Sequence, residues 1–69
     1  MSNGTDVMNA LNILAKYTEN IDMCPEHDEI YIGHEIPPGK LSLEERKKMV
    51  KYGFDWDEYI LAWHGYVSA

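Results

Sequence analysis

The chain has 69 residues, of which 12 are Asp or Glu and 6 are Lys or Arg, so its formal net charge is −6 with histidine neutral. A chain this short buries only about 60% of the surface of its unfolded state, which leaves little room to enclose a substrate. The glycine-rich motifs of dinucleotide-binding and P-loop folds are absent from the sequence. We therefore expect a single domain over residues 1–69 that is not an enzyme.

Charge, cysteine content and hydropathy indicate the partners and the cellular compartment to expect. The acidic balance opposes direct nucleic-acid binding, because that affinity rests on Lys and Arg contacts to phosphate. Cys24 is the only thiol, so no intrachain disulfide forms, and this is typical of a reducing compartment. The first residues lack the basic and apolar regions of a targeting signal, and no stretch approaches the length of a membrane span. These features predict a cytoplasmic protein without membrane contact.

The first predicted element is a helix that follows a frayed segment over residues 1–5. Thr5 or Asp6 is the expected N-cap, and Asn20 and Asp22 are expected to end the helix ahead of Pro25. Its apolar positions recur at spacings of three and four residues: Val7, Leu11, Leu14, Tyr17 or Thr18, and Ile21. Further apolar residues widen this stripe, which favours packing on a sheet or a helix-mediated dimer contact.

A strand and a loop are predicted next. In Glu29–Gly33, Ile30 and Ile32 alternate with Glu29 and Tyr31, which is the period of a half-buried strand. Two prolines and a glycine then predict a loop over residues 34–41.

The second predicted helix has the clearest local signal. Ser42 precedes Glu45 by three residues, as in a capping box, so the helix is expected to begin at Ser42. Gly53 is suited to end it in a left-handed conformation. A narrow apolar side is expected from Leu43, Met49 and Val50.

Residues 54–67 are compatible with two structures. As a helix, the segment would be capped by Asp55 and Glu58 and would place Trp56 and Trp63 on one face. As a hairpin, residues 54–56 and 61–67 would form strands around a turn at residues 57–60, in keeping with the aromatic content and Gly65. The residue pattern leaves the two structures about equally supported.

Three stretches resemble a group of small acidic proteins encoded by bacteriophages. They are residues 26–33, the Ser-x-Glu-Glu helix start, and residues 52–58 together with Trp63. The resemblance spans roughly residues 7–67 and implies an aromatic C-terminal hairpin, which selects the hairpin for residues 54–67. It further implies a phage origin, and many such proteins bind and block host proteins, including CRISPR-type defence proteins. It assigns no functional residues.

Together these elements predict an α+β domain of order helix, strand, helix, strand, strand. A short antiparallel sheet would carry both helices on one face. Exposed sheet edges and the wide apolar first helix favour a homodimer.

The expected function is that of a non-enzymatic inhibitor that binds a host protein with a basic surface, through acidic mimicry of nucleic acid. Aromatic and acidic residues near the second half of the chain are the candidate contact residues, because Trp and Tyr dominate binding hot spots. Trp56 and Trp63 are expected in the core, since a small chain needs large side chains there. The predicted partner-binding residues are Tyr31, Asp55, Asp57, Glu58, Tyr59 and Tyr66.

Two other functions were weighed against this one, and each needs specific residues. A zinc-stabilised module would need Cys24, His27, His34 and His64 to converge; only Cys24 and His27 have ligand-like spacing, so no metal or cofactor is expected. Cys24 and His27 as nucleophile and base would also lack an orienting group. A nucleotide-binding sponge at a dimer cleft would need cations for phosphate. The cations available for this are Lys40, Arg46, Lys47 and Lys51.

Overall fold

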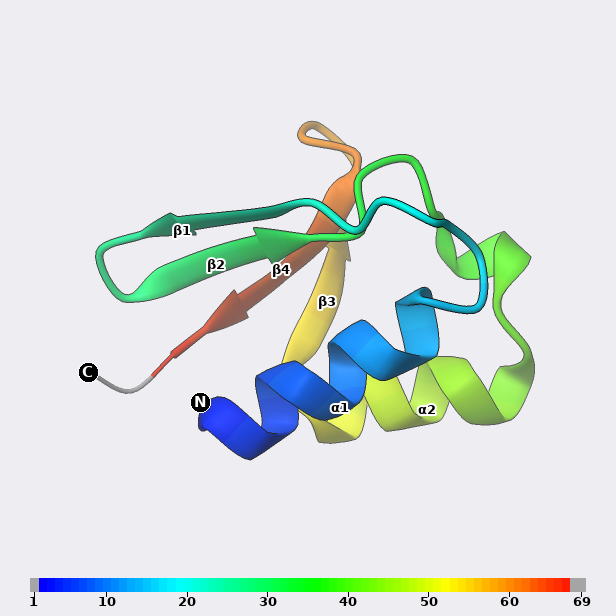
Figure 1. Ribbon diagram of the computed structural model, residues 1–69, viewed down its shortest axis with the longest axis horizontal. Coiled ribbons are helices and arrows are strands. Elements are labelled where there is room, and N and C mark those ends of the chain that lie inside the picture. Colours follow the sequence, from blue (N-terminus) through cyan, green and yellow to red (C-terminus); the bar gives the residue numbers. More distant parts are fainter. Residues whose placement is uncertain (1, 68–69) are drawn as a thin grey trace.

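The computed structural model describes residues 2–67, which form two α-helices and one four-stranded antiparallel sheet (Figure 1). The elements in chain order are α1 (Gly4–Leu14), β1 (Met23–Glu26), β2 (Glu29–Ile32), α2 (Leu43–Lys51), β3 (Phe54–Asp57) and β4 (Ala62–Tyr66). A single 3-10 turn, Pro38–Lys40, lies within the predicted loop. Among these residues, neither helix has the length and apolar character needed to cross a membrane.

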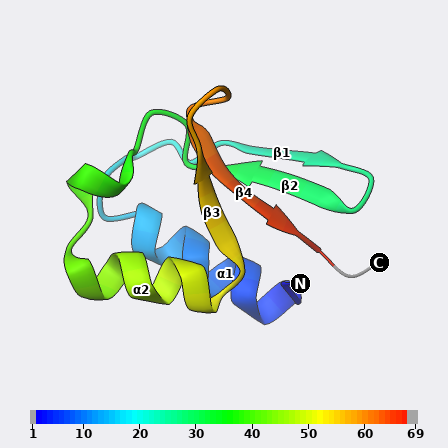
Figure 2. The same cartoon turned by 180° about the vertical axis from the view of Figure 1, so that it is seen from behind.

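The strands lie in the order β1-β2-β4-β3, and both helices lie on the same side of the sheet (Figures 1 and 2). β2 pairs with both β1 and β4, and β3 pairs with β4, always antiparallel. The predicted α+β class, with two helices on one face of a small antiparallel sheet, is therefore confirmed.

The core lies between the helices and the inner face of the sheet. Leu14 of α1, Met49 of α2, Ile32 of β2 and Phe54 of β3 are each fully buried. Gly65 lies opposite Phe54 in the β3–β4 pair, and a Cβ atom at this position would come within 2.8 Å of Phe54 Cε1. Glycine is needed here because the aromatic ring of Phe54 fills the space above its backbone.

The sheet contains one strand more than predicted. β1 pairs with β2 through a two-residue turn in which His27 has a φ of 52°. The strand contains Pro25, which cannot donate to a ladder and which the sequence pattern placed only beyond the end of the first helix. β1 is an edge strand, however, and proline is tolerated at a sheet edge because an amide there can face solvent.

The first helix begins earlier and ends much earlier than predicted. Asn3 is its N-cap, and its side chain forms a capping box with Asp6, so the prediction of Thr5 or Asp6 as N-cap is wrong. The helix ends at Leu14, where the amides of Lys16 and Tyr17 bond to the carbonyls of Ile13 and Leu14 in a tightened last turn.

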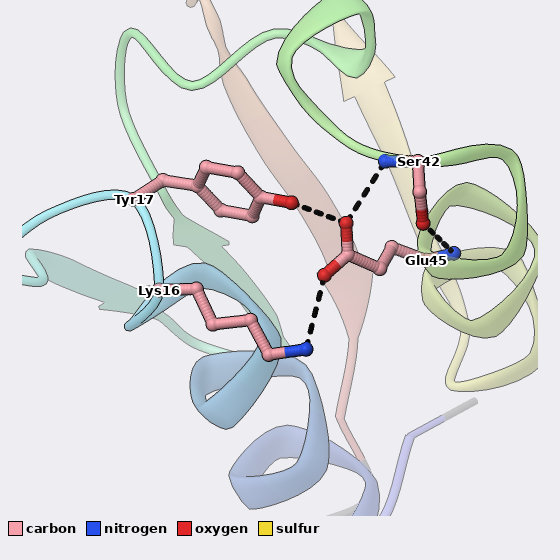
Figure 3. Close-up of polar contacts among 4 residues, drawn as sticks. All are labelled: Lys16, Tyr17, Ser42 and Glu45. Atoms are coloured by element: carbon pink, nitrogen blue, oxygen red, sulfur yellow. Dashed lines mark hydrogen bonds and ion pairs between the residues drawn. The ribbon is translucent and has the colours of Figure 1, made fainter.

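Contacts with α2 explain why the chain leaves the helical path after Leu14. Glu45 accepts hydrogen bonds from Tyr17 Oη and, at 3.2 Å, from Lys16 Nζ (Figure 3). The hydrogen bond from Tyr17 and those from Ser42 lower the pKa of Glu45 to about 2. Tyr17 therefore binds a carboxylate at the start of α2 and does not extend the apolar stripe of α1.

The second helix begins and ends as predicted, but its apolar side is narrower. Ser42 and Glu45 form the expected capping box, and Gly53 follows the helix with a φ of 91°. Met49 is fully buried, whereas the side chains of Leu43 and Val50 are 60% and 62% exposed. The prediction that Leu43 and Val50 pack inward is therefore wrong.

The C-terminal segment is a hairpin, as the resemblance implies, and not a helix. Its turn is built on Asp57, whose Oδ1 accepts from the amides of Tyr59 and Ile60, each at 2.9 Å. Trp63 is buried in the core, and its Nε1 donates to the carbonyl of Ile36 at 2.9 Å. Trp56, predicted to be core, is half-buried at its edge.

The N-terminal segment is part of the fold from residue 2 onward. The amide of Ser2 donates to the carbonyl of Tyr66 at 2.6 Å, and the Ser2 hydroxyl donates to the carbonyl of Tyr52. Ser2 is buried as a result. This differs from the frayed segment expected over residues 1–5, of which residue 1 lies outside the described residues.

Candidate functional site

The face of the sheet turned away from the helices is the candidate functional site. Side chains alternate between the two faces of a strand, so the neighbours of the buried Ile30, Ile32 and Trp63 point to this other side. Neither α1 nor α2 lies on it (Figures 1 and 2). We call it the open face. Its side chains are Cys24, Glu26, Glu29, Tyr31, Asp55, Asp57, His64 and Tyr66.

Strand register arranges these side chains in rows across the sheet. Tyr31 is paired with Cys24 on one side and with His64 on the other, and His64 is also paired with Asp55. A second row contains Glu26, Glu29 and Tyr66. The open face thus combines residues 24–31 with residues 55–66, which are distant in sequence.

The two aromatic rings and the imidazole of the open face are in contact. The ring of His64 lies 4.9 Å from that of Tyr31 and 4.9 Å from that of Tyr66, the latter in an edge-on arrangement. His64 Nε2 lies 3.0 Å from Glu29 Oε1. A carboxylate only accepts, so Nε2 carries the hydrogen and donates it, and this contact fixes the orientation of the imidazole.

Several carboxylates of the open face lie close enough to Tyr31 to raise its pKa. The pKa of Tyr31 is raised by partial burial and then by the negative charges of Glu29, Asp57 and Glu26. Two of these acids come from the β1–β2 hairpin and one from β3. Acids from the β1–β2 hairpin and from β3 therefore lie near the same tyrosine of the open face.

The cationic residues are segregated from the open face. The four strands contain four charged side chains, Glu26, Glu29, Asp55 and Asp57, and all are acids. The six Lys and Arg residues are Lys16, Lys40, Arg46, Lys47, Lys48 and Lys51, which belong to α2, the turn before it and the end of α1.

Four of the six predicted contact residues lie on the open face: Tyr31, Asp55, Asp57 and Tyr66. Glu58 and Tyr59 lie instead in the β3–β4 turn, where the Tyr59 side chain is 98% exposed. Asp57 also caps that turn through its carboxylate.

Sequence reasoning missed Glu26, Glu29 and His64 as members of the same surface. Their membership depends on the pairing of β2 with β4, which joins strands that are about thirty residues apart in the chain. Alternation within β2 was the available signal for Glu29, since it lies on the same side of the strand as Tyr31.

A pocket of about 610 Å³ lies beside the turn of the β3–β4 hairpin. The 3-10 turn Pro38–Lys40 and the side chains of Glu35, Trp56, Glu58 and Leu61 line it. Lys40 is the only lining cation and faces two lining acids, whereas Arg46, Lys47 and Lys51 belong to α2. This charge balance disfavours a phosphate-bearing ligand in the pocket.

The four residues weighed as zinc ligands do not form one cluster. Cys24 and His34 lie together, with Asp22 as their third member. His27 lies in the β1–β2 turn, and His64 lies two strands away from Cys24, beside Glu29.

No protein-family model, no curated protein and no solved structure matches this chain.

Proposed function

We propose that this chain is a non-enzymatic protein-binding module whose open face docks on a basic surface of a partner protein. The observation that carries the proposal is the gathering of four carboxylates, without Lys or Arg in any strand, on a face that neither helix covers. A positively charged partner surface complements such a face and is steered toward it in solution.

The aromatic residues of the open face provide the other part of a binding surface. Tyr66 is 53% exposed and Tyr31 is half-buried, so both present ring surface beside carboxylates. An arginine of a partner would pair with a carboxylate and stack on a neighbouring ring in one contact. Binding hot spots are enriched in this combination of residue types.

The nature of the partner follows from the charge and from the phage-like sequence pattern. Glu26 and Glu29 are paired across β1 and β2, and Asp55 and Asp57 lie two residues apart on β3, on the other side of β4. The face therefore carries an array of negative charge that spans the width of the sheet. Such an array suits a groove that otherwise holds nucleic acid. The protein is thus proposed to be a phage-encoded inhibitor of a host nucleic-acid-binding protein, for which defence proteins of the CRISPR type are the leading class.

Capture from bacterial lysate with a matched pair of variants tests this proposal. The face variant carries Glu26→Gln and Asp55→Asn, which removes two exposed charges without changing side-chain shape. The control variant carries Glu19→Gln and Glu44→Gln, which removes two exposed charges elsewhere. Retained proteins are quantified by mass spectrometry at low and high salt.

The expected result is a protein that the wild type and the control variant retain and the face variant loses, with weaker retention at high salt. The retained protein should then bind DNA or RNA, and added wild-type chain should displace that nucleic acid. Equal retention by the face variant, or failure to displace nucleic acid, would contradict the proposal.

A further inference from the structure

Three side chains of metal-ligand type converge where the sheet begins. Asp22 directly precedes β1, Cys24 lies within β1, and His34 follows β2 by two residues. Their ligand atoms, a carboxylate oxygen, the thiol sulfur and an imidazole nitrogen, all lie within 4.8 Å of one another. We call these residues the Asp22–Cys24–His34 cluster.

The pairing of β1 with β2 produces this cluster. Met23 is paired with Ile32, so the residue before β1 lies beside the residues that leave β2. Asp22 Oδ1 accepts from the amide of His34 at 3.3 Å, and its other oxygen contacts His34 Nδ1. Cys24 lies two residues beyond Asp22 and therefore on the same side of the strand.

The imidazole of His34 is positioned as a ligand. Its Nδ1 atom is shielded from solvent and contacts the Asp22 carboxylate directly, while the rest of the side chain is partly exposed. A carboxylate and an imidazole nitrogen held side by side next to a thiol are the donor types found together in transition-metal sites. A metal ion bound by the carboxylate, the thiolate and Nδ1 would replace the direct contact between Asp22 and His34.

The chemistry of the three donors selects the ion. Zn²⁺ binds cysteine sulfur, histidine nitrogen and carboxylate oxygen at about 2.0–2.3 Å in tetrahedral geometry, and these are the three donor types of the cluster. Ca²⁺ and Mg²⁺ prefer oxygen donors alone, so the thiol and the imidazole argue against them.

We propose that the Asp22–Cys24–His34 cluster binds Zn²⁺ or a similar divalent transition-metal ion. Water occupies the fourth position of the tetrahedron, since the cluster supplies three ligands. The site differs from the four-ligand set suggested by the sequence, because it includes Asp22 and excludes His27 and His64. The site shares Cys24 with the open face but uses none of the four strand carboxylates on which the docking proposal rests, and its test does not depend on partner binding.

Metal binding at this position joins β1 to the end of β2. β1 is otherwise an edge strand whose side chains are all exposed, so it has little apolar contact to hold it. The bound ion connects residues on both sides of the strand pair and binds the folded state alone. It should therefore raise the melting temperature.

Titration of the purified chain with Co²⁺ tests the site directly. Cobalt bound to a thiolate gives a sulfur-to-metal charge-transfer band in the near ultraviolet and tetrahedral bands in the visible. We expect these bands to saturate at one cobalt per chain and to be displaced by Zn²⁺. Cys24→Ser should abolish the charge-transfer band, and His34→Ala and Asp22→Asn should each weaken binding at least about 100-fold, beyond the 10–100-fold typical of outer-shell changes.

His27→Ala is the matched control, because His27 has the ligand-like spacing from Cys24 but lies outside the cluster. This variant should bind cobalt as the wild type does. A wild-type measurement avoids any folding defect of the variants: Zn²⁺ should slow alkylation of Cys24 by iodoacetamide, and Mg²⁺ should not. The proposal is overturned if the charge-transfer band is absent, if His27→Ala removes it, or if Zn²⁺ leaves the alkylation rate unchanged.

Discussion

At the residue scale, Glu45 joins the two helices through polar contacts. It caps α2 through the amide of Ser42 at 2.8 Å and also binds Lys16 and Tyr17 at the end of α1 (Figure 3). One carboxylate therefore couples the start of one helix to the end of the other.

We predict that Glu45→Gln lowers the melting temperature by several degrees at neutral pH. The amide keeps the shape of the side chain but loses the charge that stabilises its hydrogen bonds with Tyr17 and Lys16. Thermal denaturation followed by circular dichroism measures the effect. Glu44→Gln makes the same charge change one residue earlier on an exposed side chain, and it should have a clearly smaller effect.

The pH dependence of stability provides a second prediction for Glu45. Its pKa is about 2 in the folded protein, against an ordinary value of 4.5. Because the pKa of Glu45 is lower in the folded state than in the unfolded state, its carboxylate stabilises the protein fully above pH 4.5. This stabilisation is lost as the pH falls toward 2. The difference in melting temperature between wild type and Glu45→Gln should therefore shrink over this pH range. A difference that stays constant from pH 5 to pH 2 would show that the carboxylate is not the source of the effect.

At the element scale, the N-cap of α1 in the structure is Asn3, and not Thr5 or Asp6 as predicted from the sequence. Asn3 accepts from the amide of Asp6 at 2.8 Å, whereas Thr5 lies inside the helix. Asn3→Ala should destabilise the protein by about 1 kcal/mol, the usual effect of removing an N-cap side chain. Thr5→Ala should be neutral or slightly stabilising, because alanine favours helix interiors. Chemical denaturation of both variants measures the two values, and a larger loss for Thr5→Ala would contradict the assigned cap.

Sequence patterns predicted those elements whose signals are local. The capping box at Ser42 and Glu45 and the alternation of Ile30 and Ile32 both gave elements that the structure confirms. The end of α1 was not predictable, because it depends on a contact between Tyr17 and Glu45 across 28 positions. β1 was missed for a related reason: Pro25 is acceptable only at an edge, and edge position is a property of the whole sheet.

For the candidate site, too, individual residues could be predicted from the sequence, but their arrangement on one face could not. Tyr31, Asp55 and Tyr66 were identified by residue type, since aromatics and acids together suit a binding surface. That they share one face with Glu29 and His64 follows from the β2–β4 register, which no local pattern specifies. Leu43 and Val50 show the converse case, in which helical spacing suggested burial but α2 contacts the core mainly through Met49.

At the scale of the whole molecule, the two sides of the domain differ in charge. The charged side chains of the four strands are all acids, whereas every Lys and Arg lies outside the strands and four of the six lie in α2. A homodimer remains a prediction in this arrangement. Two open faces would repel each other, and β1 is a poor template for strand addition because Pro25 has no amide hydrogen. The dimer contact would therefore have to involve β3 or the helices.

Acids that serve binding and acids that serve folding should respond differently to neutralisation. Glu26 and Asp55 are exposed and stand near other carboxylates on the open face, so their charges repel and weaken the folded state slightly. We predict that Glu26→Gln combined with Asp55→Asn leaves the melting temperature unchanged or raises it, whereas Glu45→Gln lowers it. Thermal denaturation at low salt, where repulsion is least screened, gives the clearest comparison.

Comparing the melting temperatures of these variants shows whether the acids of the open face serve partner binding or support the fold. If neutralisation stabilises the domain and also removes partner capture, the acids are held at a cost to stability, as is common for functional surfaces. Added salt should then raise the melting temperature of the wild type more than that of the face variant, because it screens the same repulsion. A face variant that melts well below the wild type would instead mean that these acids support the fold, and its loss of capture could no longer be assigned to a lost contact.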